Sequence, residues 1–174
     1  MAHMQKRVLP YFRVRAIEKI GENGFKGIIA LMIAIGLVLM IIGFRLIDPV
    51  VFYDFGSVGL LLNNIIMMLA VAFIALGHSK SRFRKYFRHP MLLGIICWSV
   101  SHLLANGDSR SLILFLSFGV WSLTEIILIN RSAIHFEPFT NGSLKGDVRF
   151  VAIATLAYFG VSIAHLYLGV NPFF

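Results

Sequence analysis

Five long apolar runs, separated by short polar connections, constrain this chain more than any other feature of its sequence. They cover residues 27–47, 58–77, Pro90–Ala105, 111–129 and 148–170. An α-helix needs about 20 mostly apolar residues to cross the hydrocarbon core of a bilayer. Since 58% of the 174 residues are hydrophobic and only 14% are charged, the composition excludes an ordinary soluble domain. We therefore predict an all-α fold, a polytopic transmembrane helical bundle with about five spans.

The runs predict a simple domain organisation. Residues 1–26 form a basic arm, residues 27–170 form one bundle domain in the lipid bilayer, and residues 171–174 form a short tail. The connections are too short to hold a soluble catalytic domain. Cys97 is the one cysteine and lies in an apolar run, so neither a disulfide framework nor a CxxC metal site is available.

The basic residues predict the orientation of the bundle. All but Arg45 and Arg110 of the 16 lysines and arginines lie in the N-terminal arm or in and beside the connections 79–88 and 130–147. Because cytoplasmic connections carry the excess of lysine and arginine, we expect these segments in the cytoplasm and the C-terminus outside. The net charge is +8, but the basic residues alternate with apolar runs and do not form one continuous stripe. We therefore expect no nucleic-acid partner.

Several polar residues inside the runs share one depth. At about 1.5 Å of rise per residue, His102 lies about 20 Å beyond His89 along the third run. His165 comes near the outer end of the fifth run. The same outer layer contains four further polar residues: Asn63, Asn64, Asn106 and Asp108. Two histidines from different helices at one depth suit the axial positions of a haem, or they form hydrogen bonds that hold helices together.

Other ionisable residues have plainer interpretations. Glu125 lies about one turn from the inner interface, where it either pairs with Arg131 or extends its carboxylate to the surface. His78 and His135 are in interfacial connections, where solvation is the expected state.

Two blocks of sequence resemble the signature of the NnrU family of integral membrane proteins. The first is residues 88–94, Arg-His-Pro-Met-Leu-Leu-Gly, which is followed by Trp98. The second is residues 102–108, His-Leu-Leu-Ala-Asn-Gly-Asp, which is followed by Trp121. Residues 21–27 resemble the amphipathic entry segment of that family, and His165 with the residues after it resembles the closing segment. The resemblance covers nearly the whole chain.

This resemblance implies a bacterial inner-membrane protein that binds haem b. NnrU proteins are named from gene clusters for nitrite and nitric oxide respiration, or denitrification, and are related to zeta-carotene isomerase, a haem b membrane enzyme. Carried onto this chain, the metal ligands implied by the isomerase are His89 and His3. His102 and His165 are further candidates for cofactor binding. Five polar or aromatic residues would support the site: Arg88, Trp98, Asn106, Asp108 and Asn64.

The N-terminus departs from the family pattern. The family has an apolar helix ahead of the histidine that matches His3, whereas this chain begins two residues before it. A late start, a shortened chain and a cloning scar at residues 1–4 are the alternatives. If that helix is missing, His102 and His165 are the ligands left within the bilayer.

Three functions follow from the resemblance. One is a redox-gated isomerase that acts on a polyene or another small apolar substrate. The second is a transmembrane electron-transfer protein that uses haem or quinone. The third is a non-catalytic membrane subunit whose histidines only hold helices together. The sequence leaves the substrate and the oligomeric state open.

Overall fold

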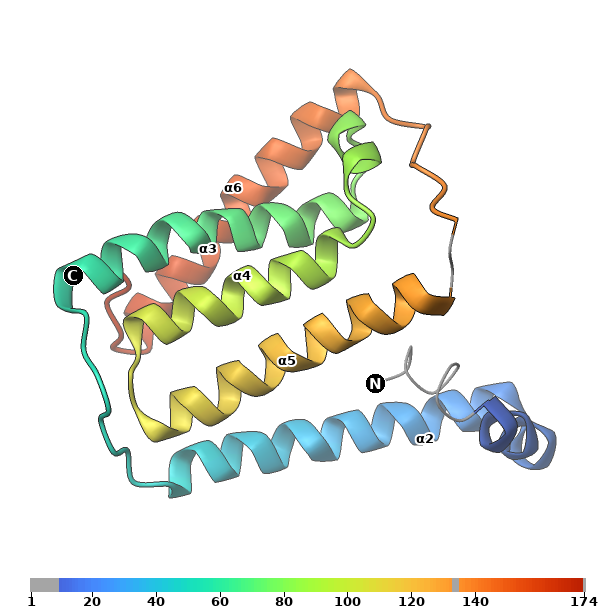
Figure 1. Cartoon of the computed structure of the whole chain (residues 1–174), viewed down its shortest axis with the longest axis horizontal. Coiled ribbons are helices and arrows are strands. Elements are labelled where there is room, and N and C mark those ends of the chain that lie inside the picture. Colours follow the sequence, from blue (N-terminus) through green and yellow to red (C-terminus); the bar gives the residue numbers. More distant parts are fainter. Residues whose placement is uncertain (1–9, 133–134, 174) are drawn as a thin grey trace. The chain divides into compact units, whose positions relative to one another are not determined.

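The computed structural model describes residues 10–132 and 135–173, and their side chains from Val14 onward. Its helices are α2 (Pro10–Leu46), α3 (Gly56–His78), α4 (Pro90–Ala105), α5 (Ser109–Ser132) and α6 (Leu144–Tyr167) (Figure 1). A short 3-10 helix, η1 (Arg82–Tyr86), lies between α3 and α4. No β-strand occurs in the described ranges, so the predicted all-α fold class is confirmed.

Four of the helices, α2, α3, α5 and α6, are long and apolar enough to span a membrane. The remaining one, α4, has 16 residues and a length of about 24 Å, which is shorter than the roughly 30 Å hydrocarbon core. Its predicted bounds agree with the structure, because Pro90 at the first helical position fixes its start.

The predicted bounds of the last span are wrong. We expected residues 148–170, whereas α6 begins at Leu144 and ends at Tyr167. The Ser143 side chain accepts a hydrogen bond from the Gly146 N–H and caps the helix before the apolar run starts. Residues 144–147 were assigned to a connection because hydropathy alone does not register a cap.

The chain divides into two compact units, Met1–Asp48 and Pro49–Phe174. Helix α2 belongs to the first unit, and its helical geometry breaks at Gly21, where φ is 73° and ψ is 164°. This positive φ favours glycine. The break lies between the basic part of α2, which begins at residue 10, and its apolar part. Just after the break, Glu22 and Lys26 form an ion pair of 2.9 Å.

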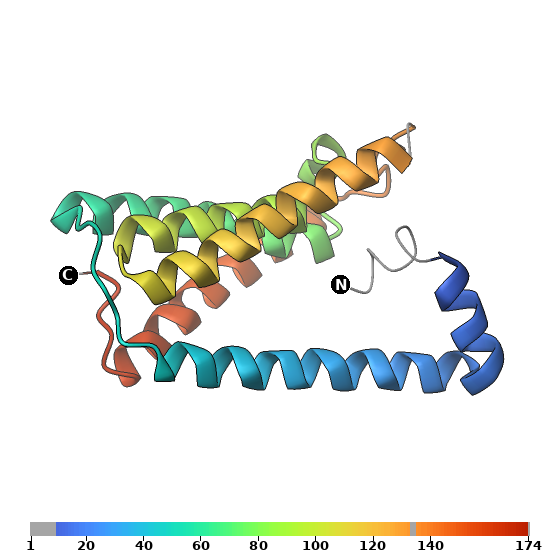
Figure 2. The same ribbon diagram turned by 60° about the horizontal axis from the view of Figure 1, so that its bottom comes forward.

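In the second unit, α4 packs against α3 and α5, and α6 packs against α3, which it crosses obliquely (Figures 1 and 2). Glycines allow these helices to approach closely. A Cβ atom at Gly94 of α4 would lie 2.9 Å from the Ala70 carbonyl oxygen of α3. A Cβ atom at Gly59 of α3 would collide with the Leu104 carbonyl oxygen. Small residues at contacts are typical of helix packing in membranes.

The distribution of side chains is the reverse of that in a soluble protein. The largest fully buried side chains are Glu125, Ser81, Ser99, Ser101 and Ser122. Large apolar side chains lie on the surface instead, for example Leu156, which is 73% exposed. An apolar surface around small and polar interior residues suits a lipid solvent. Together with the apolar helices, it makes this chain a multi-pass membrane protein.

Candidate functional site

His102 is held in one tautomer and one ring plane near the end of α4. Its Nδ1 lies 3.1 Å from the Trp98 carbonyl oxygen. Because a carbonyl oxygen only accepts, Nδ1 carries the proton and Nε2 carries the lone pair. The imidazole stacks on Phe115 of α5 at a centroid distance of 4.4 Å and lies 5.2 Å from the Trp98 ring. These contacts leave Nε2 as the nitrogen able to bind a metal.

His165 has the same hydrogen bond on another helix. Its Nδ1 donates to the Val161 carbonyl oxygen at 2.8 Å, one turn earlier in α6. An electrostatic repulsion from His165 acts on His102, so both imidazoles lie in the same part of the second unit. We call this part of the second unit, where α4 and α6 end and α5 begins, the His102 end.

A short crossing segment fixes the backbone at the His102 end. The Tyr53 hydroxyl donates to the Leu103 carbonyl oxygen at 2.7 Å, and the Phe52 N–H donates to the Gly107 carbonyl oxygen at 2.8 Å. A Cβ atom at residue 107 would collide with the Tyr53 carbonyl oxygen, so the close approach requires glycine. Asn106 donates from Nδ2 to the His102 carbonyl oxygen at 3.0 Å and closes the last turn of α4.

Asp108 caps the start of α5. Its carboxylate accepts hydrogen bonds from the Ser111 hydroxyl at 2.7 Å and from the Arg110 N–H at 3.0 Å. Burial acts to raise the pKa of Asp108, but the hydrogen bonds from Ser111 and Arg110 outweigh it and hold the pKa below its usual value. The expected polar residue therefore has a structural role as a helix cap.

Asn64 joins three parts of the chain at the same end. Its Nδ2 donates to the Leu60 carbonyl oxygen at 3.0 Å and to the Pro172 carbonyl oxygen at 2.9 Å. Its Oδ1 accepts from the Tyr158 hydroxyl at 3.2 Å. Because these contacts tie α3 to α6 and to the C-terminal segment, Asn64 helps to position the helix that carries His165.

His89 lies at the opposite end of α4, in the N-cap position. Its Nε2 donates to the Asn130 Oδ1 of α5 at 2.9 Å, which is a hydrogen bond between helices. The neighbouring Arg88 guanidinium lies over the Phe136 ring at 5.8 Å. His3, the expected partner of His89, lies outside the described residues. We call this end of the second unit, which includes η1, the basic end.

Glu125 is buried between the helices without a hydrogen-bond partner among the described residues. It is 1% exposed, and neither carboxyl oxygen is bonded in the described part of the chain. The expected pairing with Arg131 or extension to the surface is therefore wrong, because the side chain turns into the helix contact. The hydroxyls of Ser122 on the same helix and Ser99 on α4 are also buried without partners. Isolated polar groups of this kind are costly.

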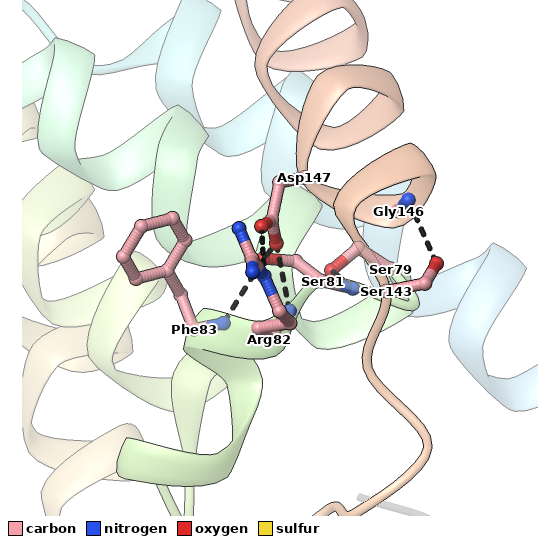
Figure 3. Close-up of polar contacts among 7 residues, drawn as sticks. All are labelled: Ser79, Ser81, Arg82, Phe83, Ser143, Gly146 and Asp147. Atoms are coloured by element: carbon pink, nitrogen blue, oxygen red, sulfur yellow. Dashed lines mark hydrogen bonds and ion pairs between the residues drawn. The ribbon is translucent and has the colours of Figure 1, made fainter.

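Asp147 was not expected as a structural centre, yet it joins the η1 segment to α6 (Figure 3). Its carboxylate accepts from the Ser81 hydroxyl at 2.7 Å, the Arg82 N–H at 2.7 Å and the Arg82 Nε at 2.6 Å. The Ser143 N–H also donates to the Lys80 carbonyl oxygen at 3.1 Å. The available signal was a lone acidic residue at the start of an apolar run, opposite a basic connection.

A model of the NnrU protein family matches residues 1–172. The chain belongs to the NnrU family. No curated protein and no solved structure matches it. The family assignment inferred from the His89 and His102 blocks is therefore confirmed, and the functional roles of individual residues in this NnrU protein are argued below from its own geometry.

The described residues offer two imidazoles at the His102 end and no larger cluster of metal-binding side chains. Such a metal needs several protein ligands, and the described residues gather no group of three or more His, Cys, Asp or Glu able to hold one. Haem supplies four ring nitrogens and asks the protein for one or two imidazoles. His102 and His165 offer two, each with its Nδ1–H held by a backbone carbonyl.

Proposed function

We propose that this NnrU protein binds haem b at the His102 end, where Nε2 of His102 and Nε2 of His165 would hold it. The observation that carries the proposal is the shared hydrogen bond from Nδ1 to a carbonyl oxygen one turn earlier. Histidines that bind metals are held in this way, because the second bond sets the tautomer and raises the basicity of the ligating nitrogen.

The same hydrogen bonds argue against a purely structural role for this pair. Histidines that join helices would bond from one helix to another, whereas His102 and His165 bond within their own helices. His89 does the opposite, since its partner Asn130 is on α5. We therefore assign the role of joining helices to His89 and the role of ligation to the other two.

When bound, haem iron supplies one-electron redox chemistry. The chain then has three tasks: the Trp98 and Val161 carbonyl oxygens orient the two imidazoles, Phe115 fixes the ring plane of His102, and the aromatic cluster excludes water. If both histidines hold the haem, no open position would be left for a substrate, and this favours electron transfer as the function.

A redox-gated isomerase is the second candidate, and it rests on the unequal packing of the two histidines. His102 is clamped between aromatic rings, whereas His165 has no ring contact among the described residues. His165 would therefore be the more readily released of the two, and its release would open a place for a small apolar substrate. The relation to zeta-carotene isomerase and the link to nitrogen-oxide respiration remain predictions from the resemblance.

Haem content of purified variants tests the proposed site. We expect the detergent-purified protein to give a pyridine haemochrome spectrum, and His102→Ala and His165→Ala each to lose most of the haem. His135→Ala, in an exposed connection, is the matched control and should keep it. The reduced spectrum separates the two functions: two imidazoles in both redox states favour electron transfer, and a ligand lost on reduction favours the isomerase.

The opposite pattern would place the haem elsewhere. If His89→Ala lost haem while His102→Ala and His165→Ala kept it, the cofactor would lie at the basic end. A wild-type protein without haem, expressed with a haem supply, would remove the proposal altogether.

We also propose an orientation in the bacterial inner membrane, with the basic end in the cytoplasm and the C-terminus outside. The excess of lysine and arginine at η1 and around the start of α6 supports it. This orientation puts the two candidate ligands in the outer half of the bilayer.

A further inference from the structure

A groove runs between α3 and α6 in the second unit. Its volume is about 770 Å³, and its walls are mainly apolar, with Ile74 from α3 and Phe150 and Ile153 from α6. Along α6 the lining extends from Lys145 to Val161, which corresponds to about 24 Å of helix. One leaflet contributes roughly 15 Å of hydrocarbon core. The groove is therefore long enough to start at the membrane surface and enter the hydrocarbon.

The mouth of the groove is positively charged. Lys80, Lys145 and Arg149 line it at the basic end. None of the three is paired with a carboxylate within the described ranges. Asp147, the nearest acidic residue in sequence, is 7% exposed and accepts its hydrogen bonds from Arg82 and its neighbour (Figure 3). The groove thus combines an uncompensated cationic mouth with an apolar wall.

We propose that the α3–α6 groove holds one anionic phospholipid, with its phosphate at the cationic mouth and an acyl chain along the apolar wall. Basic pockets between transmembrane helices are where anionic headgroups bind. A free phosphate ion would use the mouth and leave the wall uncovered. The volume lies within the range of about 300–1,000 Å³ that is usual for small-molecule sites, which suits one headgroup and the upper part of a chain.

The chain itself does not supply a suitable occupant for the mouth. Its net charge is +8, and lysine and arginine outnumber glutamate in its N-terminal arm, so a second copy or the arm would bring further positive charge to the groove. An anionic lipid has both a negatively charged headgroup for the cationic mouth and an acyl chain for the apolar wall. The headgroup part of this proposal is independent of haem binding, because the groove mouth lies at the basic end. The inner end of the groove reaches Val161, one turn before the candidate ligand His165.

Lipid binding to the full-length detergent-purified protein tests the proposal. Native mass spectrometry measures the affinity for added phosphatidylglycerol, phosphatidylcholine and inorganic phosphate. We expect one phosphatidylglycerol bound more tightly than phosphatidylcholine. The double variant K145Q/R149Q should weaken phosphatidylglycerol binding about thirty-fold, since each Lys or Arg near an anionic lipid is worth a factor of about five. The double variant K85Q/R131Q removes the same charge outside the groove and should bind normally.

A second variant separates a lipid from a phosphate ion. Ala157→Phe fills the apolar wall and leaves the mouth intact, so it should reduce phosphatidylglycerol binding while the haem content stays unchanged. Equal losses in K145Q/R149Q and K85Q/R131Q would overturn the proposal in favour of non-specific attraction. Tight binding of inorganic phosphate with no effect of Ala157→Phe would overturn it in favour of an ion site.

Discussion

At the scale of single residues, hydrogen-bond direction separates groups that look alike in the sequence. His89 and His102 lie on one helix, but one donates to a neighbouring helix and the other to its own backbone. Glu125 and Asp108 are both carboxylates near the ends of spans, but Asp108 has four donors around it and Glu125 has none in the described part of the chain. The chemical role of each residue follows from these partners.

Asp108→Ala should destabilise the protein at neutral pH. The variant loses the acceptor for the Ser111 hydroxyl and for the first N–H groups of α5, and the loss of such a cap costs about 1–2 kcal/mol. Since hydrogen bonds hold the pKa of Asp108 below its usual value, the folded state binds fewer protons than the unfolded state. Its contribution is complete above the usual value of 3.8 and disappears as the pH falls through the lower folded value.

Thermal unfolding of the wild type and Asp108→Ala at neutral and acidic pH measures this effect. The difference in Tm should narrow at acidic pH. Asp108→Asn is the control, because asparagine also caps helices but does not titrate; it should keep most of the Tm at neutral pH. A Tm difference for Asp108→Ala that stays constant at acidic pH would contradict the role assigned to the carboxylate.

At the scale of elements, close helix packing in the second unit depends on glycine at particular positions. Gly94→Ala should lower the Tm, because its Cβ atom would lie 2.6 Å from Ile74 Cγ1 and 2.9 Å from the Ala70 carbonyl oxygen. Gly160→Ala in α6 meets nothing within 4 Å, so it should stabilise its helix by about 0.5–1 kcal/mol. The two substitutions are chemically identical, and thermal unfolding should give opposite signs. A stabilising Gly94→Ala would mean that α3 and α4 do not pack this closely.

Hydropathy predicted the long helices, but it did not predict where most of them begin and end or which helices contact each other. The third span was predicted with its observed bounds because Pro90 marks the start and the Asn106-Gly107 turn marks the end. The start of α6 was missed because Ser143 and Asp147 fix it through side-chain hydrogen bonds. Helix η1 was also missed, since a basic connection without apolar periodicity gives no helical signal.

At the scale of the whole molecule, the distribution of basic residues predicts the orientation across the membrane. In a Cys97→Ser background, Lys85→Cys reports the basic end and Asn171→Cys reports the C-terminal segment. We expect a membrane-impermeant maleimide to label Asn171→Cys in intact cells and Lys85→Cys only after lysis, because lysine and arginine are retained in the cytoplasm. Labelling of Lys85→Cys in intact cells would reverse the proposed orientation.

The candidate site was partly predictable from the sequence. Rise per residue predicts His102 and His165 at one depth, and an electrostatic repulsion between them indicates that both lie in the same part of the second unit; their joint role as ligands stays a prediction. Their ring orientation was not predictable, because it depends on the Trp98 and Val161 carbonyl oxygens and on stacking against Phe115. The role of His89 with His3 stays a prediction, since His3 lies outside the described residues.

Electron paramagnetic resonance of the oxidised, haem-loaded protein tests the central claim most directly, because the ferric spin state reports the axial ligands. We predict a low-spin signal with two imidazole ligands in the wild type and an unchanged signal in His89→Ala. The residual haem that His165→Ala retains should give a high-spin signal. A wild-type protein with a high-spin signal, or a low-spin signal that survives in both His102→Ala and His165→Ala, would contradict ligation by these two histidines.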